Sequence, residues 1–511
     1  MTASRASTGL NRPAITVCVM LATLMQALDT TIANVALPYM QGSVSASQDQ
    51  IDWVLTSYIV AAAIMTPPTG YLAGRFGLKR LFLVAVAGFT VASVLCGVAQ
   101  SLMQIVLFRV LQGCFGASLV PLSQTVLLDI NPKEKQGSAM AMWGVAVMAG
   151  PVLGPVLGGW LTDAYSWRYV FYINVPIGIL TCLGISTFLP ETPRNTTAKL
   201  DWFGFGTLSV AIAGLQLVLD RGEEKDWFGS SEIIAEAITA AVAFYLFLVH
   251  TFTARTPFVR PSLFKDRNFT AGVLFVAIVG LTYYASLALQ PPYLQDLMNY
   301  PIVTAGLVMG PRGVGTMAAM FVVGKLIGRV DTRALLGIGL GLTAWSFYEM
   351  TGWTPDVSQT TIIVVGVFQG MGLGFLFVPL SVATLSTLSS EKRAEGAGLY
   401  SLSRNIGSSV GIAVVNSLLT TNTQINHADI AQYVTPANRA FDNPMVLRFW
   451  SPVTAAGRAA LDAVITRQAE IIAYIDDYKF LMIATIAVVP LLIVFKKAGG
   501  GGKPDHTIAV E

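Results

Sequence analysis

Five ionisable side chains lie inside stretches that are otherwise apolar: Asp29, Arg109, Arg312, Glu349 and Arg404. A charge at the centre of a membrane-spanning helix costs about 2.5–3.5 kcal/mol on insertion scales, so such residues are usually paired or functional. Asp29 is the most informative, because a carboxylate can take up and release a proton. Burial favours its protonated form and a nearby cation favours its ionised form. We therefore predict that Asp29 couples proton movement to function; the alternative is a permanently paired structural anion.

Arg109 is the candidate partner of Asp29. At 1.5 Å per residue, Asp29 lies about 21 Å from the cytoplasmic end of its apolar segment, and Arg109 about 10 Å from the external end of its own. The two distances together match the ~30 Å hydrocarbon core, so the two residues can lie at one level. We predict that Arg109 tunes proton binding at Asp29; the alternative is a structural arginine that binds backbone carbonyls.

The composition predicts the elements that position these charges. The chain has 511 residues, of which 54% are apolar and only 12% charged, and its mean hydropathy is +0.62. A membrane span needs about 20 apolar residues. On this measure the sequence predicts an all-α polytopic membrane protein with fourteen transmembrane helices, at about 15–38, 51–73, 80–99, 102–128, 137–160, 169–189, 202–220, 232–251, 269–294, 303–328, 334–352, 359–387, 396–420 and 478–495. The four cysteines lie in these segments without CxxC spacing, which favours packing roles over metal binding.

The basic residues predict the orientation. Of the 32 Lys and Arg residues, 21 lie in the two tails and in alternate connections, whereas the short connections on the opposite side hold only Arg168, Arg221 and Lys225. The positive-inside rule then places both termini in the cytoplasm and the long segment 421–477 outside. Within it, 454–477 reads as an amphipathic helix that lies on the membrane surface or meets a partner helix.

The chain repeats itself. The pattern at 70–75 returns at 324–329, and Pro38-Tyr39 returns as Pro292-Tyr293, both after 254 residues; Gln112 returns as Gln369 after 257. This predicts two related six-helix units, 15–189 and 269–495, joined by a linker, 190–268, with two additional helices and flanked by tails 1–14 and 496–511. Two such halves with a site between them are typical of alternating-access transporters. The position that corresponds to Asp29 in the second unit is Tyr283, so the carboxylate is unmatched.

Two glycine-containing motifs suggest moving parts. The segment 144–159 contains Gly144, Gly150, Gly154, Gly158 and Gly159 together with Pro151 and Pro155. Small residues let helices touch and proline kinks a helix, which predicts a gate helix, although ordinary close packing gives a similar pattern. The loop after the second span contains Gly70, Arg75, Gly77, Lys79 and Arg80. Its cations can meet a carboxylate or a helix C-terminus when the halves close; a topology signal is the alternative.

These motifs resemble those of the major facilitator superfamily. The loop 70–80 resembles its motif A, with Gly74 where that motif usually has Asp, and 107–116, which contains Arg109, resembles motif B. The segment 144–159 resembles motif C of its antiporters. The stretch 28–38 resembles a motif of its fourteen-span drug:proton antiporters, and the segments 167–176, 219–228 and 262–269 extend the likeness over most of the chain.

The resemblance implies a function. It implies the major facilitator fold and an inner-membrane pump that expels hydrophobic drugs in exchange for protons, without a cofactor beyond the proton motive force. It also implies two partners, a periplasmic adaptor protein and an outer-membrane channel, besides the lipid bilayer. Candidate substrate-binding residues are Asn34, Gln112, Tyr283, Arg312 and Arg404; both arginines are also candidate partners of Glu349.

Other functions remain possible from the sequence. An exporter of one metabolite, such as a siderophore, a sugar or an amino acid, uses the same mechanism. A membrane-embedded enzyme is disfavoured because the spans contain no HExxH, paired-His or Ser/His pattern, and nothing indicates a metal site or nucleic-acid binding. A sensor or scaffold is disfavoured by the two-half repeat with its unmatched carboxylate.

Overall fold

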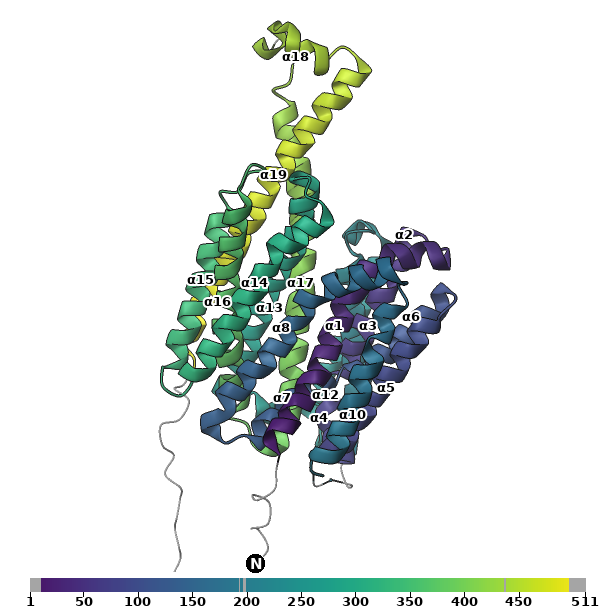
Figure 1. Cartoon of the computed structure of the whole chain (residues 1–511), viewed down its shortest axis with the longest axis vertical. Helices are drawn as coiled ribbons and strands as arrows, with labels where there is room; N and C mark the ends of the chain where they lie inside the picture. Colours follow the sequence, from purple (N-terminus) through teal and green to yellow (C-terminus); the bar gives the residue numbers. More distant parts are fainter. Residues whose placement is uncertain (1–10, 193, 196–198, 436–437, 496–511) are drawn as a thin grey trace, which may run out of the picture.

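The computed structural model describes residues 11–192, 194–195, 199–435 and 438–495. These residues form helices throughout, with one isolated bridge between Ile327 and Val330, which confirms the all-α prediction. The tail 496–511 and most of the tail 1–14 lie outside the described residues. Figure 1 shows two helical bundles side by side, with α1 beginning at the bottom of the view. We call this the lower end of the molecule, and the end that carries α2 and α18 the upper end.

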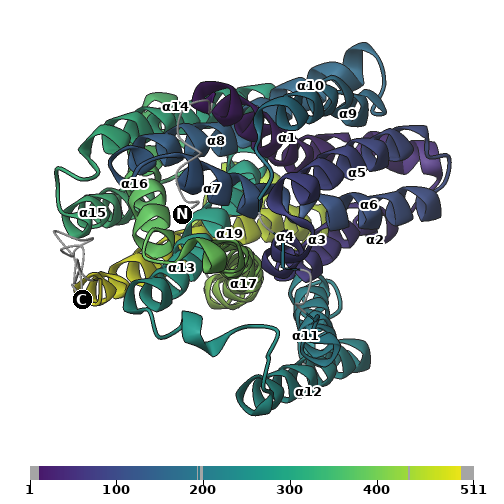
Figure 2. The same ribbon diagram turned by 90° about the horizontal axis from the view of Figure 1, so that it is seen from below.

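The helices form a first half, an inserted pair and a second half. The first half comprises α1 (Arg12–Val44), α2 (Gln48–Ile51), α3 (Trp53–Met65), α4 (Thr69–Phe76), α5 (Leu78–Val98), α6 (Leu102–Gly116), α7 (Leu119–Ile130), α8 (Lys133–Ala164), α9 (Tyr169–Tyr172) and α10 (Asn174–Phe188). The inserted pair is α11 (Trp202–Arg221) and α12 (Ser231–Thr253), with the short η1 (Trp227–Gly229) between them. In Figure 2 this pair lies outside the two bundles.

The second half begins after the short η2 (Pro261–Leu263). It comprises α13 (Arg267–Pro292), η3 (Tyr293–Leu297), α14 (Ile302–Leu326), α15 (Thr332–Met350), α16 (Gln359–Leu385), α17 (Ser390–Ala431), η4 (Arg439–Asp442), α18 (Pro444–Phe449), α19 (Ala455–Ala487) and η5 (Val489–Ile493). Several helices are preceded by a residue whose side chain accepts a hydrogen bond from a backbone N–H of the first helical turn. This N–H would otherwise have no partner within the helix. These caps are Asn11, Ser101, Asp201, Asp266, Asp331 and Ser358.

The repeat seen in the sequence is also a repeat of helices. Leu78 and Thr332, which begin α5 and α15, are 254 residues apart. Lys133 and Ser390, which begin α8 and α17, are 257 residues apart, as are the first residues of α6 and α16. The turns before α5 and α15 each contain a residue with positive φ, Gly77 at 87° and Gly328 at 88°. Such a backbone favours glycine, which has no Cβ to clash.

Among the described residues, ten helices are long and apolar enough to cross a membrane. The predicted span 51–73 is not one helix: it divides into α3 and α4 at Pro67-Pro68, because proline has no N–H to donate. The remaining predicted spans correspond to α15, α17 and α19, which are helical but fall outside the ten. The count of fourteen is therefore consistent with the fold and stays a prediction.

The segment 421–477 differs from the prediction. The expected amphipathic helix at 454–477 is not a separate surface helix, because α19 runs without a break from Ala455 to Ala487, into the predicted last span. It packs along the 42-residue helix α17, and in Figure 1 the two project beyond the upper end with α18 at the tip. His427 on α17 and Asp462 on α19 make a hydrogen bond at 2.9 Å that joins the projecting parts. We call this feature the projecting hairpin.

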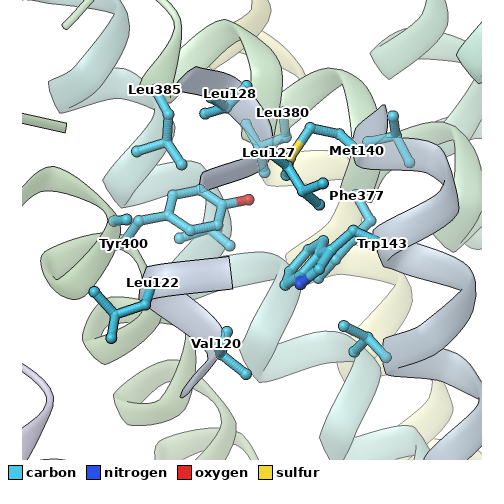
Figure 3. Close-up of a cluster of buried hydrophobic side chains, with 14 of the residues drawn as sticks. Val120, Leu122, Leu127, Leu128, Met140, Trp143, Phe377, Leu380, Leu385 and Tyr400 are labelled. Atoms are coloured by element: carbon cyan, nitrogen blue, oxygen red, sulfur yellow. The ribbon is translucent and has the colours of Figure 1, made fainter. Parts of the chain in front are cut away.

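The two halves touch at the lower end through apolar side chains. Trp143 of α8 stacks on Phe377 of α16, with ring centroids 5.5 Å apart and planes at 11°. Figure 3 shows these rings among side chains of α7, α8, α16 and α17. Near the same end, Asp129 of α7 forms an ion pair with Arg393 of α17. The lower end is thus closed in this structure.

Candidate functional site

Asp29 and Arg109 are in contact at the centre of the first half. Arg109 Nη1 lies 2.7 Å from Asp29 Oδ2, and the side chains are 1% and 0% exposed. α1 supplies the carboxylate and α6 the guanidinium. The two helices place the residues at one level, as the depth argument predicted, and the structure adds that they face each other. A buried pair of this kind needs further hydrogen bonds to offset its desolvation.

Those hydrogen bonds come from neighbouring helices. Asp29 Oδ1 accepts from Gln112 Nε2 at 2.7 Å and from Asn174 Nδ2 at 3.0 Å. Arg109 donates from Nε to the Val54 carbonyl at 3.0 Å and from Nη1 to Gln112 Oε1 at 2.8 Å. Hydrogen bonds therefore reach both carboxylate oxygens of Asp29 and two nitrogens of the Arg109 guanidinium, which offsets the burial of the two charges.

Tyr58 separates this pair from a cavity. The Arg109 guanidinium lies over the Tyr58 ring, 4.3 Å from its centroid, which adds a cation–π contact. The same tyrosine lines a cavity of about 730 Å³ between the two halves, and its hydroxyl accepts from Gln26 Nε2 at 3.4 Å. A molecule in the cavity can therefore touch a residue that touches Arg109.

The cavity reaches the upper end of the molecule. Its wall includes Asp52 and Trp53 at the start of α3, the last turn of α11, and Pro291 at the end of α13. Of the substrate candidates predicted from sequence, Asn34, Tyr283 and Arg404 line it. Most of its wall is aromatic and aliphatic, which is typical of a site for largely apolar ligands, and its charged side chains lie mainly at the upper end.

The other two candidates lie away from the cavity wall. Gln112 is fully buried beside Asp29 and Arg109, where both atoms of its amide are engaged. Arg312 is 4% exposed and donates to Gln290 Oε1 at 3.0 Å and Ser286 Oγ at 3.2 Å, beneath the ring of Tyr283. The expected pairing of an arginine with Glu349 is not among the ion pairs of the described residues.

The glycines of α8 form the contact with α1. A Cβ at Gly150 would lie 2.5 Å from the Ala27 carbonyl carbon, and one at Gly158 would lie 2.9 Å from Ile32 Cγ1. Gly154 is equally close to Thr31, whose hydroxyl donates to the Gly150 carbonyl at 3.1 Å. Only glycine allows the backbones to approach this closely.

The other residues of this motif have different surroundings. Gly144 faces Met320 of α14 in the other half, whereas a Cβ at Gly159 would meet no atom within 4 Å. Pro151 lines the cavity, and Pro155 is exposed on the outside of the helix. α8 therefore connects the Asp29 helix, the cavity and the second half.

Comparison with known proteins now identifies the family. The family model of the Major Facilitator Superfamily matches residues 19–412. The chain is 35% identical to the fatty acid resistance protein FarB of Neisseria gonorrhoeae over 493 residues, and 36% identical to the multidrug export protein EmrB of Escherichia coli K12 over 505; each match covers 96% of this chain and 97% of the relative. This chain belongs to the major facilitator superfamily.

Solved structures agree on the fold. The human organic anion transporter MFSD10 matches with a TM-score of 0.59 over 93% of this chain and all of its own, at 15% identity. The proton:xylose symporter XylE matches with a TM-score of 0.57 over 92% of this chain and 96% of its own, at 14% identity. The family match and the full-length relatives show a multi-pass membrane transporter of small molecules that resides in a lipid bilayer.

The loop motif of the superfamily lies at the lower end. A Cβ at Gly70 would lie 2.5 Å from the Glu395 Cα of α17, so α4 and α17 touch there. Gly77 provides the positive-φ turn, Lys79 Nζ donates to the Ser186 carbonyl at 2.7 Å, and Arg75 Nη1 is buried without a hydrogen-bond partner in the described part of the chain. Gly74 lines a second cavity, of about 1130 Å³, on this face.

Arg80 belongs to a small charge cluster at this end. It lies 3.8 Å from Glu191, which also pairs with Arg194 at 2.8 Å. The hydrogen bond from Arg194, with Arg80 and Lys79 nearby, lowers the pKa of Glu191. The cluster ties the loop motif to the residues that follow α10.

Sequence reasoning missed two residues of the charged site. Asn174 begins α10 inside an apolar stretch, and only the contact of α10 with α1 shows that its amide reaches Asp29. Tyr58 carries no charge and stands in an ordinary apolar segment. A polar amide inside a span was the available signal for Asn174, and Tyr58 offered none.

Proposed function

We propose that this protein exports hydrophobic, drug-like compounds across the inner membrane in exchange for protons. The observation that carries the proposal is the buried Asp29–Arg109 pair, whose guanidinium lies over Tyr58, a residue in the wall of the cavity between the halves. Its similarity to EmrB and FarB over nearly the full length supports export of such compounds.

Asp29 is the proposed proton carrier and Arg109 the residue that tunes it. A proton on Asp29 removes the charge that holds Arg109 Nη1, which leaves the guanidinium bound to Gln112 and the Val54 carbonyl. The Tyr58 ring lies against the guanidinium, so a shift of Arg109 changes the cavity wall. Coupling between two sites is reciprocal. A bound substrate that displaces Tyr58 therefore shifts Arg109 and changes how Asp29 binds a proton.

Alternating access requires the lower end to open. The contacts that must break include the Asp129–Arg393 ion pair, the close approach of Gly70 to Glu395, and the Trp143–Phe377 stack. We propose that α8 transmits this motion, because its glycine face lies on the Asp29 helix and its prolines weaken its hydrogen-bond ladder at 151 and 155. The loop motif at 70–80 then guides closure at this end.

We further propose the setting of the protein. Both termini lie in the cytoplasm, so the projecting hairpin enters the periplasm. There it docks a periplasmic adaptor protein that leads to an outer-membrane channel. The domain limits proposed for the two halves are 15–189 and 269–495, with the inserted pair within 190–268.

Purified protein in liposomes tests the proposal. We expect an imposed proton gradient to drive transport of several structurally unrelated hydrophobic compounds, and substrate movement to change the lumenal pH. Transport of a single metabolite, with no response to the hydrophobic set, would assign a specific exporter instead. Transport that ignores the proton gradient would contradict the proposal.

A further inference from the structure

The inserted helix α11 forms part of the cavity wall. It packs against α3 of the first half and α17 of the second, as the view in Figure 2 also shows. Gln216 Nε2 donates to Ser409 Oγ of α17 at 2.9 Å, and the Ser409 hydroxyl donates back to Gln216 Oε1 at 3.1 Å. This reciprocal bond fixes the level of α11 against α17.

Asp220 lies one turn above Gln216 and lines the cavity. Its Oδ1 accepts from Gln216 Nε2 at 2.8 Å, whereas Oδ2 is buried and has no hydrogen-bond partner in the described part of the chain. Thr56 of α3 stands beside the same carboxylate. The inserted helix α11, which is not part of the two-half repeat, therefore places a hydrogen-bond acceptor in the wall of the cavity between the halves.

The adjacent cation does not neutralise Asp220. Arg221 turns to α12, where it pairs with Glu232 at 2.5 Å and Glu236 at 3.7 Å, and its guanidinium lies over the Trp53 ring. Glu223 and Glu224 also line this end of the cavity. The upper part of the cavity thus carries negative charge.

Arg404 provides the opposite charge at the lower part of the same cavity. It is 9% exposed, and neither Nε nor Nη1 has a hydrogen-bond partner among the described residues. Nη2 makes one long bond, 3.4 Å, to the side chain of its neighbour Asn405. A nearly buried charge without a partner costs free energy. A ligand that pairs with it removes this cost, which favours binding.

The Gln216–Ser409 bond allows the spacing of the two charges to be estimated. α11 and α17 both run from the lower to the upper end, because Asp201 and Ser390 at their beginnings line the lower cavity, whereas Arg221 and Asn416 line the cavity that reaches the upper end. Asp220 is four residues above Gln216 and Arg404 is five residues below Ser409, so their levels differ by about 13 Å at 1.5 Å per residue. The rings of Tyr58, Tyr283 and Tyr284 line the cavity with them.

We propose that this cavity recognises zwitterionic amphiphiles, with Asp220 binding the ammonium group and Arg404 the carboxylate of one ligand. The inference rests on the proposed function and names its substrate class. A hydrophobic acid pairs only with Arg404, and a hydrophobic amine pairs only with Asp220. A zwitterion with an aromatic body pairs with both residues and also packs against the aromatic wall between them. Charge-assisted hydrogen bonds are the strong polar contacts of such a site.

Binding of three matched probes to the purified full-length protein tests this inference. The probes share one aromatic body and carry an ammonium and a carboxylate about 13 Å apart, the carboxylate alone, or the ammonium alone. A hydrogen bond to a charged group contributes about 1.5–3 kcal/mol, so Asp220→Asn weakens binding of the zwitterion and the amine about ten- to hundred-fold. The acid keeps its affinity in this variant.

Arg404→Gln gives the mirror result: binding of the zwitterion and the acid weakens, and the amine keeps its affinity. Asp220→Glu retains the charge and restores selectivity for the amine, which separates recognition from a folding defect. Asp163→Asn is the matched control, because this α8 carboxylate accepts from Tyr39 and lies outside the cavity wall. We expect the Asp163→Asn variant to bind all three probes with the affinities of the wild type.

Equal weakening of all three probes in Asp220→Asn would assign a structural role and overturn the inference, and so would three unchanged affinities. Proton-driven efflux of the acid probe by the same variant separates the two proposals. If the variant exports the acid normally but fails with the zwitterion, both stand. If the wild type binds the three probes as expected and exports none of them with a proton gradient, only the proposed function fails.

Discussion

The two halves share one helical plan but place their buried charges differently. In the first half, Asp29 of α1 and Arg109 of α6 form a closed ion pair, with Tyr58 of α3 against the cation. The corresponding positions of the second half hold Tyr283, Gly366 and Arg312. There the cation has moved from the α6 position to the α3 position, and the carboxylate has become the tyrosine whose ring lies 4.7 Å from the guanidinium carbon.

The difference assigns different tasks to the halves. Gln112 and Gln369 correspond in the repeat, and both bind within these polar clusters, Gln369 through Ser286 at 3.0 Å. The second cluster thus keeps the amide, the ring and a permanently charged arginine, and its described residues include no carboxylate that bonds to this arginine. We therefore propose that proton coupling belongs to the first half, and that the second half supplies a fixed charge and part of the cavity wall.

The glycines are shared while the prolines are not. Gly150 and Gly154 of α8 correspond to Gly407 and Gly411 of α17, which approach the Ala277 and Leu281 carbonyls of α13 as closely as α8 approaches α1. Pro151 and Pro155, however, correspond to Ser408 and Ile412. Both halves therefore have this close helix contact, but only the first half has prolines that interrupt the backbone hydrogen bonds of the helix.

Asp29→Asn should have the largest effect on transport. The amide keeps the size of the side chain but cannot exchange a proton, so we expect proton-driven efflux in liposomes to fall to background. Efflux in Arg312→Gln, the matched change in the second half, should remain coupled to the gradient. Coupled transport at the wild-type rate in Asp29→Asn would refute the division of tasks.

Arg109→Gln and Arg312→Gln should differ in stability. Removing Arg109 leaves Asp29 buried without its cation, which costs about 3–5 kcal/mol. Removing Arg312 leaves no carboxylate behind, and losing its bonds to Gln290 and Ser286 costs about 1–3 kcal/mol. Denaturant unfolding of both variants in detergent measures the contrast; equal losses would mean that the two arginines have equivalent surroundings.

Pro151→Ala and Pro155→Ala should slow transport without destabilising the protein. Alanine restores the missing N–H donors and stiffens α8. A rise of about 1.4 kcal/mol in the barrier slows a step tenfold, and we expect an effect of this size in the double variant. Ser408→Ala in α17 is the control, and turnover in liposomes is the measurement. An unchanged rate in the double variant would remove the gate role from α8.

Lys79→Ala and Arg333→Ala should have small and equal effects. These residues correspond in the repeat, and both donate to carbonyls at the lower end of their half: Lys79 to Ser186 in the last turns of α10, and Arg333 to Phe495, just after η5. A cation at a helix C-terminus contributes about 0.3–1 kcal/mol. Thermal unfolding of both variants checks this, and a large difference between them would show that the halves are not equivalent even here.

Much of this comparison was predictable from the sequence. The charge inside an apolar run located Asp29, the interval of 254 residues located the repeat, and the depth estimate placed Arg109 level with its partner. These features follow from composition and spacing along the chain. The rotation of one helix against another does not, so the contacts of Asn174 and Tyr58, and the position of Gln112 inside the charged cluster, required the structure.

Two carboxylates were missed for the same reason. Asp220 stands at the end of an inserted span, where it reads as an interfacial residue, and only the packing of α11 on α3 and α17 brings it into the cavity. Asp477 was placed outside the last span, but the unbroken helix α19 buries it completely, with neither carboxylate oxygen hydrogen-bonded within the described residues.

The most direct test of the central claim, that Asp29 is the coupling carboxylate, is proton release on substrate binding. Purified protein in weakly buffered detergent solution is mixed with a hydrophobic substrate at a series of pH values, and a pH-sensitive dye reports the released protons. The wild type should release protons in proportion to bound substrate, and Asp29→Asn should bind substrate and release none. Equal release by the two proteins would contradict the account.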